Sequence, residues 1–373
     1  MSGADSVRHL IKGLGPGGAE RLLLTQVRSD PSPTRHEVAY VVPEKRHLVP
    51  EFEAAGVHPV CLGEGVLRWS RGVRRLMVDE PTRIVHVHSP AVAAVTRLVV
   101  ATVPRSIRPV VVGTEHNRWP RHHRLTRLAN RLTIRREAAT IAVSADVAST
   151  VRGARPGRLT TVEHGVDLEA VRAEADRAGV RDAFGVAGND VLVVCVANLR
   201  REKALDELVE AARLALAEVP ELRFFSVGQG PLAADLDRWI RSAGIADRFH
   251  PLGYRDDAPR ILSAADVFTL SSHHEGLPVA VMEAFALGVP VVATAAGGVP
   301  DAVGDAGVIT PIGDPVALAA AYVDLARDPA RRAALADSAT ARATHFSARR
   351  AVAEINEIYD AVTKAGTDPS ARS

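Results

Sequence analysis

The sequence contains only two cysteines, Cys61 and Cys195, which lie far apart in a chain of 373 residues. Both lie in apolar, strand-like runs, so we expect buried, reduced thiols rather than a disulfide framework. No uninterrupted apolar run approaches the roughly 20 residues that a membrane-spanning helix needs. The first residues also lack the apolar segment of a secretory signal. These absences predict a cytoplasmic protein.

The chain has no large excess of charge of one sign. Its net charge is +2, so no overall field favours nucleic acid as a partner. Hydrophobic residues make up 47% and charged residues 24%, which is ordinary for a globular protein. At roughly 100–200 residues per domain, the length predicts two domains, each able to bury its own core.

Short β-branched apolar runs alternate with longer helical segments. Such runs are typical of buried parallel strands, because helices cover both faces of the sheet. The alternation predicts the α/β class, with two doubly wound parallel sheets. We expect strands at residues 9–14, 37–42, 58–62, 84–88, 110–114, 140–143 and 159–162 in the first half, and at 191–197, 223–227, 249–252, 267–271, 290–294 and 307–310 in the second.

A charged helical stretch followed by Gly185 and Gly188 separates the two sets of strands. We therefore expect a first domain at 1–185 and a second at 186–347. A helix at 348–364 should follow the second domain, and 365–373 should form a disordered tail. Ligands bind at the carboxyl ends of strands in such sheets, so the expected site is the cleft between the domains.

The most informative segment has the sequence SSHHEGLPVAVMEA and begins at Ser271. A strand ends there, and the amides of Gly276 and Leu277 precede a helix N-terminus, where anions are attracted. Glu283 lies within that apolar helix, and an unpaired buried carboxylate is costly. Pairing of Glu283 with the two hydroxyls of a ribose is therefore favoured over a solvated position. Glu275 should face the cleft, unless it only complements the helix dipole.

Basic residues follow the strand at 191–197. Arg200 and Lys203 lie at a helix start, where fixed cations can stabilise the charge of a departing diphosphate without a metal. A solvated cationic loop is the alternative. The turns that begin at Gly228 and Gly253 also follow strands, but each alone is ordinary loop chemistry.

Two patterns suggest a metal site, and neither is favoured. His273 and His274 are adjacent on a loop, and adjacent histidines rarely chelate one ion without further ligands. Asp235 and Asp237 form a D-x-D pattern in a helical stretch, where residues two apart point in different directions.

Together these motifs resemble the retaining glycosyltransferases of family 4. The resemblance covers roughly residues 8–359, and its signature is the pair Glu275 and Glu283, eight residues apart, in S-x-x-E-G-…-E-A. It implies the GT-B fold, in which two Rossmann-like domains face each other across a cleft. It also implies transfer of a hexosyl group from a nucleotide diphosphate-sugar to a hydroxyl acceptor, with retention of anomeric configuration. No metal, cofactor or side-chain nucleophile is implied, and the leaving phosphate takes the proton of the acceptor.

The resemblance also assigns roles to residues. Glu283 would bind the ribose, Lys203 the diphosphate, and His116 the transferred sugar. Asn198 stands where many members have an arginine, and Ala204 replaces a usual glycine. The predicted catalytic residues are His116 and Glu275, and the predicted donor site comprises Gly17, Gly18, Arg200, Lys203, Gly253, Tyr254, Arg255, Glu275, Gly276, Leu277 and Glu283. The loop at 253–255 would flank the base, and a UDP-sugar is favoured over GDP-mannose.

Three other functions remain open, one of which is a GT-B-fold epimerase or phosphorylase. Gly13, Gly15 and Gly18 fit the dinucleotide fingerprint G-x-G-x-x-G, which would indicate an NAD-dependent oxidoreductase. That pattern leaves Glu275 and Lys203 unexplained. The third alternative is an inactive partner subunit that only binds a nucleotide-sugar.

Residues 118–136 are rich in arginine, with interspersed apolar residues. They suit a helix on an anionic membrane at the inner face, near a lipid-linked acceptor. An arginine-rich helix whose apolar face packs on the sheet is favoured over that location. A small molecule or a glycan are the other acceptor classes. His86 and His88 alternate on one strand, and structural histidines are favoured there over ligands.

Overall fold

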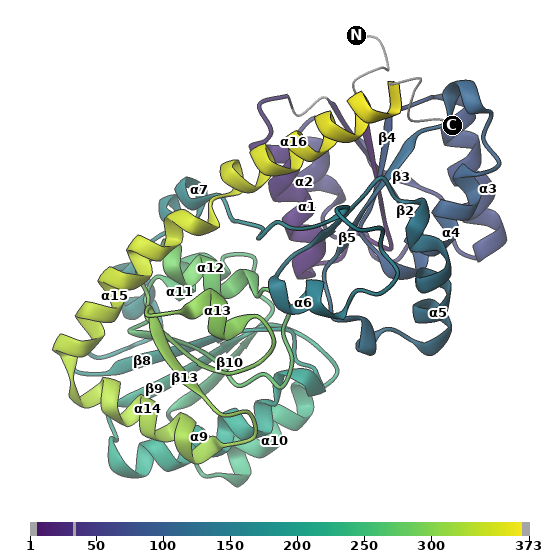
Figure 1. The fold of residues 1–373 in the computed structure, drawn as a ribbon. Helices are drawn as coiled ribbons and strands as arrows, with labels where there is room; N and C mark the ends of the chain where they lie inside the picture. Colours follow the sequence, from purple (N-terminus) through teal and green to yellow (C-terminus); the bar gives the residue numbers. More distant parts are fainter. Residues whose placement is uncertain (1–5, 33–34, 368–373) are drawn as a thin grey trace. The chain divides into compact units, whose positions relative to one another are not determined.

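The computed structural model describes residues 6–32 and 35–367, which divide into two compact units (Figure 1). Unit 1 contains residues up to Gly165 together with the chain from Ala348 onward, and unit 2 spans Val166–Ser347. The boundary therefore lies earlier than the expected 185/186. The intervening α7 (Leu168–Ala173) and α8 (Arg177–Ala183) belong to unit 2. Arg172 of α7 and Arg177 of α8 anchor them by donating to the carbonyl oxygens of Ala286 and Ala265, at 2.9 and 2.7 Å.

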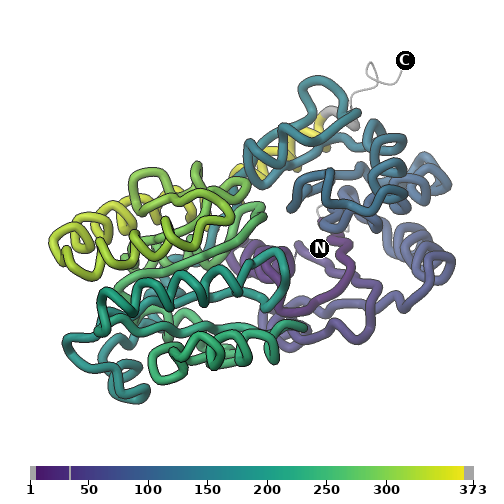
Figure 2. The backbone as a smooth tube through the Cα atoms, turned by 90° about the horizontal axis from the view of Figure 1, so that it is seen from below, coloured from purple at the N-terminus to yellow at the C-terminus, as the bar shows by residue number. Residues whose placement is uncertain are grey.

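The C-terminal helix α16 (Ala348–Thr367) belongs to unit 1. The expectation that it follows the second domain is true only in sequence, because Ile355 and Tyr359 pack into a core cluster with Val7 and Val112. In Figure 2 the yellow tube of α16 reappears among the blue and teal segments of unit 1. Residues 365–367 continue the helix, so the predicted disordered tail is wrong for these three residues, and the rest of it, 368–373, lies outside the described residues.

Unit 1 is built on a parallel sheet of order β3-β2-β1-β4-β5-β6-β7. Consecutive residues on β1 point to opposite faces, so Leu10 packs against α3 and α4 while Ile11 packs against α1 and α2. The elements are β1 (Val7–Ile11), α1 (Gly18–Ser29), β2 (His36–Tyr40), α2 (Val49–Ala54), β3 (Val60–Cys61), α3 (Val66–Asp79), β4 (Ile84–Val87), α4 (Pro90–Val100), η2 (Arg105–Ile107), β5 (Val110–Glu115), η3 (Trp119–Arg121), α5 (Arg124–Thr133), η4 (Ile134–Arg136), β6 (Ala139–Ala142), α6 (Ala145–Thr150) and β7 (Leu159–Thr161).

Unit 2 is built on a second parallel sheet, of order β10-β9-β8-β11-β12-β13. The elements are β8 (Val191–Val196), η5 (Arg201–Lys203), α9 (Leu205–Glu218), β9 (Leu222–Val227), α10 (Ala233–Ser242), β10 (Phe249–Gly253), α11 (Ala258–Leu262), β11 (Val267–Leu270), α12 (Val279–Ala286), β12 (Val291–Thr294), α13 (Val299–Val303), β13 (Gly307–Thr310), α14 (Pro315–Arg327), α15 (Pro329–Ala343) and η6 (Thr344–Phe346).

Every strand expected from the apolar runs is present, with shifted ends. Strand β1 ends at Ile11 rather than at Leu14, because the chain turns at Gly13 and the amide of Leu14 donates to the carbonyl of Lys45 at 2.6 Å. The expectation of two buried thiols is half wrong. Cys195 is buried in β8, but Cys61 is exposed because β3 is a two-residue strand at the edge of its sheet.

A buried ion pair fixes the helices on one face of unit 1. Two nitrogens of Arg97, Nε and Nη2, donate to Glu137 Oε1 at 2.9 and 2.6 Å. Arg97 also donates to Asn130 Oδ1 at 2.6 Å, so α4 is tied to α5. The carboxylate lies directly over the backbone of β5, and a Cβ at Gly113 would meet its Oε1 at 2.1 Å. Only glycine leaves room for the pair.

Residues 118–136 do not pack as favoured from the sequence. Trp119 and Ile134 are buried, but Leu125, Leu128 and Leu132 on α5 are 71%, 54% and 68% exposed. The side of α5 that faces the unit carries Asn130 and Thr133 instead. Among the described helices, none combines the length and the apolar character needed to cross a bilayer.

Replacing Arg97 by methionine should lower the free energy of unfolding by about 3–5 kcal/mol, because Glu137 then remains buried without its partner. Urea denaturation measures the change. The matched control is Arg75→Met, which removes an exposed arginine paired with Asp79 and should change stability by less than about 0.5 kcal/mol. Equal stability of both variants would contradict the role of the buried pair.

Candidate active site

In unit 2, a lysine and a glutamate meet at the point where the strand order reverses. The sheet runs outward from β8 in one direction and from β11 in the other, and ligands bind outside the carboxyl ends of strands at such a switch point. Lys203 follows β8 and Glu275 follows β11. Lys203 Nζ lies 2.5 Å from Glu275 Oε1, and both side chains are largely buried. Two of the predicted site residues are therefore in direct contact.

Hydrogen bonds from neighbouring hydroxyls hold the two loops in place. Ser272 Oγ donates to Glu275 Oε1 at 2.6 Å, and Ser271 Oγ donates to the carbonyl oxygen of Lys203 at 2.8 Å. Thr294, at the end of β12, donates to the carbonyl of Ser272 at 2.5 Å. The carboxylate and the ammonium group are thus positioned before any ligand arrives.

One of the two histidines of this loop contacts a carboxylate, and the other is exposed. His273 Nε2 lies 2.7 Å from Glu207 Oε1 of α9, and its backbone amide donates to Glu202. His274 is exposed. Asp235 lies in α10 and pairs with Arg238 three residues later, at 2.5 Å. His273 and Asp235 therefore each have a partner within the protein.

The glycine turns after β9 and β10 are more important than their sequence suggested. A Cβ at Gly228 would lie 1.9 Å from the carbonyl oxygen of Ala197, and one at Gly230 would lie 2.3 Å from that of Leu199. The amide of Gly228 also donates to Gly253 at 2.8 Å. The loop that leads to Lys203 therefore packs backbone against backbone on its neighbour. The sequence signal was G-Q-G after a strand, which is too common to be recognised alone.

Two other predicted donor residues of unit 2 are more exposed than this pair. Arg200 is exposed and Tyr254 is 46% exposed. Arg255 donates through Nε and Nη2 to both oxygens of Asp257 at 2.8 Å, and this pairing raises the pKa of the Arg255 guanidinium. Gly253 has a φ of +68°, which suits glycine.

Gly276, Leu277 and Glu283 lie on the loop and helix that follow Glu275. The first two precede the N-terminus of α12, as expected, although the helix starts at Val279 and Pro278 is its N-cap. Leu277 is buried. Glu283 is half-buried rather than enclosed, because it lies with Val279 and Ala280 on the less buried side of α12, away from the fully buried residues of that helix.

In unit 1, Gly17 and Gly18 begin α1, where Gly17 is the N-cap. A Cβ at Gly17 would meet Glu20 Oε2 at 2.3 Å. Burial raises the pKa of Glu20, although Lys45 and Lys12 oppose the shift. Two lysines therefore lie near this helix N-terminus.

His116 follows β5 and packs beside other histidines. Its ring centroid is 5.6 Å from that of His164 and 5.8 Å from that of His88. Burial, together with His164 and His88, lowers the pKa of His116 well below its usual value. The adjacent Glu115 is a functional candidate that the sequence did not reveal. Burial and the Glu137 carboxylate raise the pKa of Glu115 to about 7.

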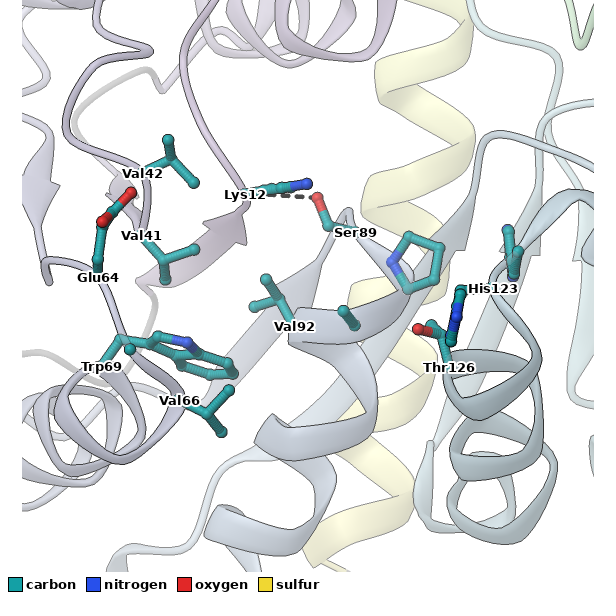
Figure 3. A pocket seen from close by; sticks show the side chains of 14 residues that line it. Lys12, Val41, Val42, Glu64, Val66, Trp69, Ser89, Val92, His123 and Thr126 are labelled. Atoms are coloured by element: carbon teal, nitrogen blue, oxygen red, sulfur yellow. Dashed lines mark hydrogen bonds between the residues drawn. The ribbon is translucent and has the colours of Figure 1, made fainter.

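Unit 1 also contains a cavity of about 470 Å³ at its own switch point, between β1 and β4. Figure 3 shows Val41, Val92 and Trp69 lining it, with Lys12 and Ser89 at one end. The backbone amide of Lys12 donates to Ser89 Oγ at 3.0 Å. The lining is mainly apolar, and two of its polar side chains, Lys12 and Ser89, lie just after strands β1 and β4. Sequence reasoning missed this cavity.

Among the described residues, ring nitrogens of His9, His86 and His88 lie within 4.8 Å of one another, as a metal site would require. His86 is already satisfied on both sides, since its Nδ1 lies 2.6 Å from the hydroxyl of Tyr359 and its Nε2 lies 2.7 Å from Thr114 Oγ1. Both nitrogens of His86 are thus satisfied, as the favoured structural role requires, whereas His88 Nδ1 has no hydrogen-bond partner in the described residues.

Ala204 joins Lys203 to α9 in a left-handed conformation, with φ +45° and ψ +52°. Because a Cβ disfavours this conformation, Ala204→Gly should stabilise the protein by about 1 kcal/mol. Ala334→Gly, at an exposed position inside α15, should instead cost about 1 kcal/mol. Urea denaturation of both variants checks the sign. Destabilisation by Ala204→Gly would show that this backbone is not strained.

Both halves of the chain match models of glycosyltransferase families. Residues 6–170 match the Glycosyltransferase Family 4 model, and residues 190–328 match the Glycosyl transferases group 1 model. The D-inositol 3-phosphate glycosyltransferase of Saccharomonospora viridis is 34% identical over 230 residues, covering 58% of this chain and 53% of the relative. The N-acetyl-alpha-D-glucosaminyl L-malate synthase of Bacillus anthracis is 27% identical over 172 residues, covering 46% and 45%. The chain spans about half the length of these curated relatives.

Solved structures share the fold. HepE of Anabaena, crystallised with UDP, superposes with a TM-score of 0.83 at 22% identity, covering 95% of this chain and 100% of that one. WaaG, a glycosyltransferase involved in lipopolysaccharide biosynthesis, superposes with a TM-score of 0.72 at 16% identity, covering 94% and 99%. Two Rossmann-like domains and these neighbours identify the GT-B fold. From the matches to both halves, the chain belongs to the family 4 glycosyltransferases.

Proposed function

We propose that the protein is a retaining, metal-independent hexosyltransferase, which moves a sugar from a nucleotide diphosphate-sugar to a hydroxyl acceptor. The observation that carries this proposal is the contact between Lys203 and Glu275 at the switch point of unit 2. A largely buried cation at this position suits a diphosphate, since fixed positive charge stabilises a leaving group as it becomes more negative.

In this mechanism Glu275 has two roles. Its Oε1 holds the ammonium group of Lys203 in position, and its other oxygen is available to a hydroxyl of the donor sugar. Arg200 is exposed nearby and supplies further positive charge. The amides of Gly276 and Leu277 precede α12, where anionic oxygens are stabilised. No step requires a metal, and the leaving phosphate accepts the acceptor's proton.

We favour UDP as the nucleotide. The Anabaena neighbour was crystallised with UDP, with UDP and glucose, and with UDP-glucose, which supports this choice by analogy of fold alone. Tyr254 and Arg255 would flank the base, and Glu283 would accept hydrogen bonds from the ribose. GDP-mannose is the second candidate. In unit 1, Gly17 and Gly18 would approach the phosphates, and His116 would bind the transferred sugar.

We place the acceptor in the cavity of unit 1. Its lining by Val41, Val92 and Trp69 suits an apolar group, while Lys12 and Ser89 can orient a polar one. An acceptor that combines both, such as a lipid-linked molecule, fits this lining better than a free sugar does.

A peripheral membrane contact through residues 118–136 agrees with such an acceptor. Leu125, Leu128 and Leu132 form an exposed apolar stripe on α5, and Arg124 and Arg131 on the same helix are exposed too. Arginines beside an exposed apolar stripe suit an anionic bilayer surface. The occupant proposed for this stripe is therefore lipid.

Calorimetry with UDP, GDP and pyrophosphate tests the donor site. Lys203→Ala should weaken the binding of UDP and of pyrophosphate alike, by about ten- to a hundredfold, because a charge-assisted contact to phosphate is lost. Glu283→Gln should weaken the binding of UDP but not that of pyrophosphate, since only UDP carries a ribose. Arg213→Ala, which removes a glutamate-paired arginine of α9, is the matched control and should bind like the wild type.

Transfer is then assayed with UDP-sugars in the presence of EDTA, and NMR of the product reports the anomeric configuration. Inversion would contradict the retaining mechanism, and loss of activity in EDTA would contradict metal independence. Nucleotide binding without transfer to any acceptor would favour the inactive partner subunit. Tighter binding of NAD than of UDP, GDP or pyrophosphate would favour an NAD-dependent oxidoreductase instead.

Vesicle sedimentation tests the membrane contact. The wild type should bind vesicles rich in phosphatidylglycerol more strongly than vesicles of phosphatidylcholine, and high salt should weaken the binding. Changing Leu125, Leu128 and Leu132 together to glutamine should abolish it. The control changes Leu98 and Val316, which are similarly exposed, to glutamine. If the control loses vesicle binding to the same extent as the α5 variant, α5 has no specific role in the membrane contact.

A further inference from the structure

The cavity of unit 1 lies at the start of helix α4, which begins without a side-chain cap. The hydroxyl oxygen of its N-cap, Ser89, accepts instead from the backbone amide of Lys12 at 3.0 Å. Pro90 follows and has no N–H, so the first amides of the helix are those of Ala91 and Val92, and both residues line the cavity. The positive end of the helix dipole therefore lies at the cavity wall.

A lysine lies beside this helix start. Lys12 directly follows β1, and Figure 3 shows its side chain next to Ser89 at the cavity. Lys12 is exposed, so its ammonium group can reach a ligand. A helix N-terminus with a cation beside it suits an anion, because the amides donate hydrogen bonds and the ammonium group adds positive charge.

A buried histidine without a partner lines the same cavity. The side chain of His122 is only 8% exposed, and among the described residues neither of its ring nitrogens has a hydrogen-bond partner. The carboxylate of Glu115 lies 4.0 Å from His122 Nε2, which is too far for a hydrogen bond. Buried polar atoms without partners are costly. We therefore expect a group from outside the chain to satisfy this ring.

The rest of the cavity suits an apolar group. Val41, Trp69 and Val92 line it, and all three are buried. A cavity of about 470 Å³ has room for a ligand much larger than a phosphate ion. The lining as a whole thus fits an anion that carries an apolar substituent.

We propose that Lys12, the amides of Ala91 and Val92, and the ring of His122 form a phosphate subsite in this cavity, which takes a lipid phosphate. The apolar part of the lipid lies against Trp69. As the place of the acceptor, this subsite rests on the proposed function, and it narrows the acceptor to a lipid phosphate whose headgroup carries the accepting hydroxyl. Binding of the phosphate itself does not depend on sugar transfer.

Other charged groups lie around the subsite. Burial, together with a neighbouring carboxylate, raises the pKa of Glu115 to about 7, so its negative charge is incomplete near neutral pH. Arg127 of α5 adds positive charge near His122. The one acidic residue that lines the cavity, Glu64, lies at the end opposite His123 in Figure 3. The charge around the subsite therefore favours an anion.

Calorimetry with four small probes tests the subsite. Lys203→Ala protein is used throughout, so that the proposed donor site of unit 2 does not contribute. Octyl phosphate, kept below its micelle concentration, should bind at least about tenfold more tightly than octyl glucoside, which has the same tail without the phosphate. It should also bind more tightly than inorganic phosphate and glucose 6-phosphate, which lack the tail.

Two results with these probes would count against the proposal. Octyl glucoside that binds as tightly as octyl phosphate would overturn the phosphate subsite. Glucose 6-phosphate that binds as tightly as octyl phosphate would overturn the lipid, and it would indicate a free sugar phosphate instead.

Two substitutions of Ser89 separate charge from folding. Aspartate and asparagine are both good N-cap residues, so Ser89→Asp and Ser89→Asn should both keep α4 intact. Only Ser89→Asp places a negative charge at the helix start, and it should bind octyl phosphate at least about tenfold more weakly than Ser89→Asn does. Equal affinity of the two variants would show that no anion binds at this helix start.

Lys12→Met should weaken the binding of octyl phosphate by about tenfold and leave that of octyl glucoside unchanged. The matched control is Lys364→Met, which removes an exposed lysine of α16 that does not line the cavity. It should bind octyl phosphate like the parent protein. Equal weakening in both variants would contradict a specific contact with Lys12.

NMR titration of the histidines tests the contact with His122. Burial, and after it Arg127, lowers the pKa of the His122 ring in the free protein. An anion beside the ring favours its charged form, so octyl phosphate should raise the pKa of His122, and octyl glucoside should not. His58, an exposed histidine, is the control and should not change. An unchanged pKa of His122 with octyl phosphate bound would remove this ring from the subsite and leave water as its partner.

These measurements separate the subsite from the proposed function, because they need neither a donor nor transfer. Sugar transfer to a neutral alkyl acceptor, without binding of octyl phosphate, would overturn the subsite and keep the transferase. Tight binding of octyl phosphate without transfer to any acceptor would keep the subsite and count against the transferase.

Discussion

The contact between Lys203 and Glu275 is the interaction on which the organisation of unit 2 around its site depends. It joins the loops after β8 and β11, the two strands from which the sheet grows in opposite directions. The crossovers from β8 and β11 leave the sheet on different sides, so the two loops separate and leave space at this point. The ion pair, with the hydroxyls of Ser271 and Ser272, holds both loops at the edge of that space.

The switch point of unit 1 is organised differently from that of unit 2. Its switch point lies between β1 and β4, and the loops there enclose an apolar cavity rather than an ion pair. Below them, polar rings occupy positions where a sheet of this kind normally buries aliphatic residues. His9 and His86 are direct neighbours across β1 and β4. Buried polar atoms are usually hydrogen-bonded, and Thr114 and Tyr359 satisfy both nitrogens of His86 in this way.

The strands could be predicted because continuous β-branched runs of this length, bounded by turn residues, rarely form anything but buried strands. The domain boundary could not be predicted in the same way. Nothing in the sequence of residues 166–185 shows that Arg172 and Arg177 donate to carbonyl oxygens 114 and 88 residues later in the chain. The packing of α5 was predicted wrongly for a related reason. Its leucines have the spacing of a buried face, but the buried Arg97–Glu137 pair takes Asn130 and Thr133 as its partners and so turns the leucines outward.

By itself the sequence determined the class of fold and the order of its strands along the chain, because strand runs are local features; the donor-site residues that it indicated remain a prediction. Only the tertiary structure decided which of these residues touch. It placed Lys203 against Glu275, packed Gly228 and Gly230 onto the preceding loop, left Glu283 half-buried, and aligned three histidines from three strands. These are contacts between segments far apart in the chain, and spacing along a sequence contains no information about distances across a sheet.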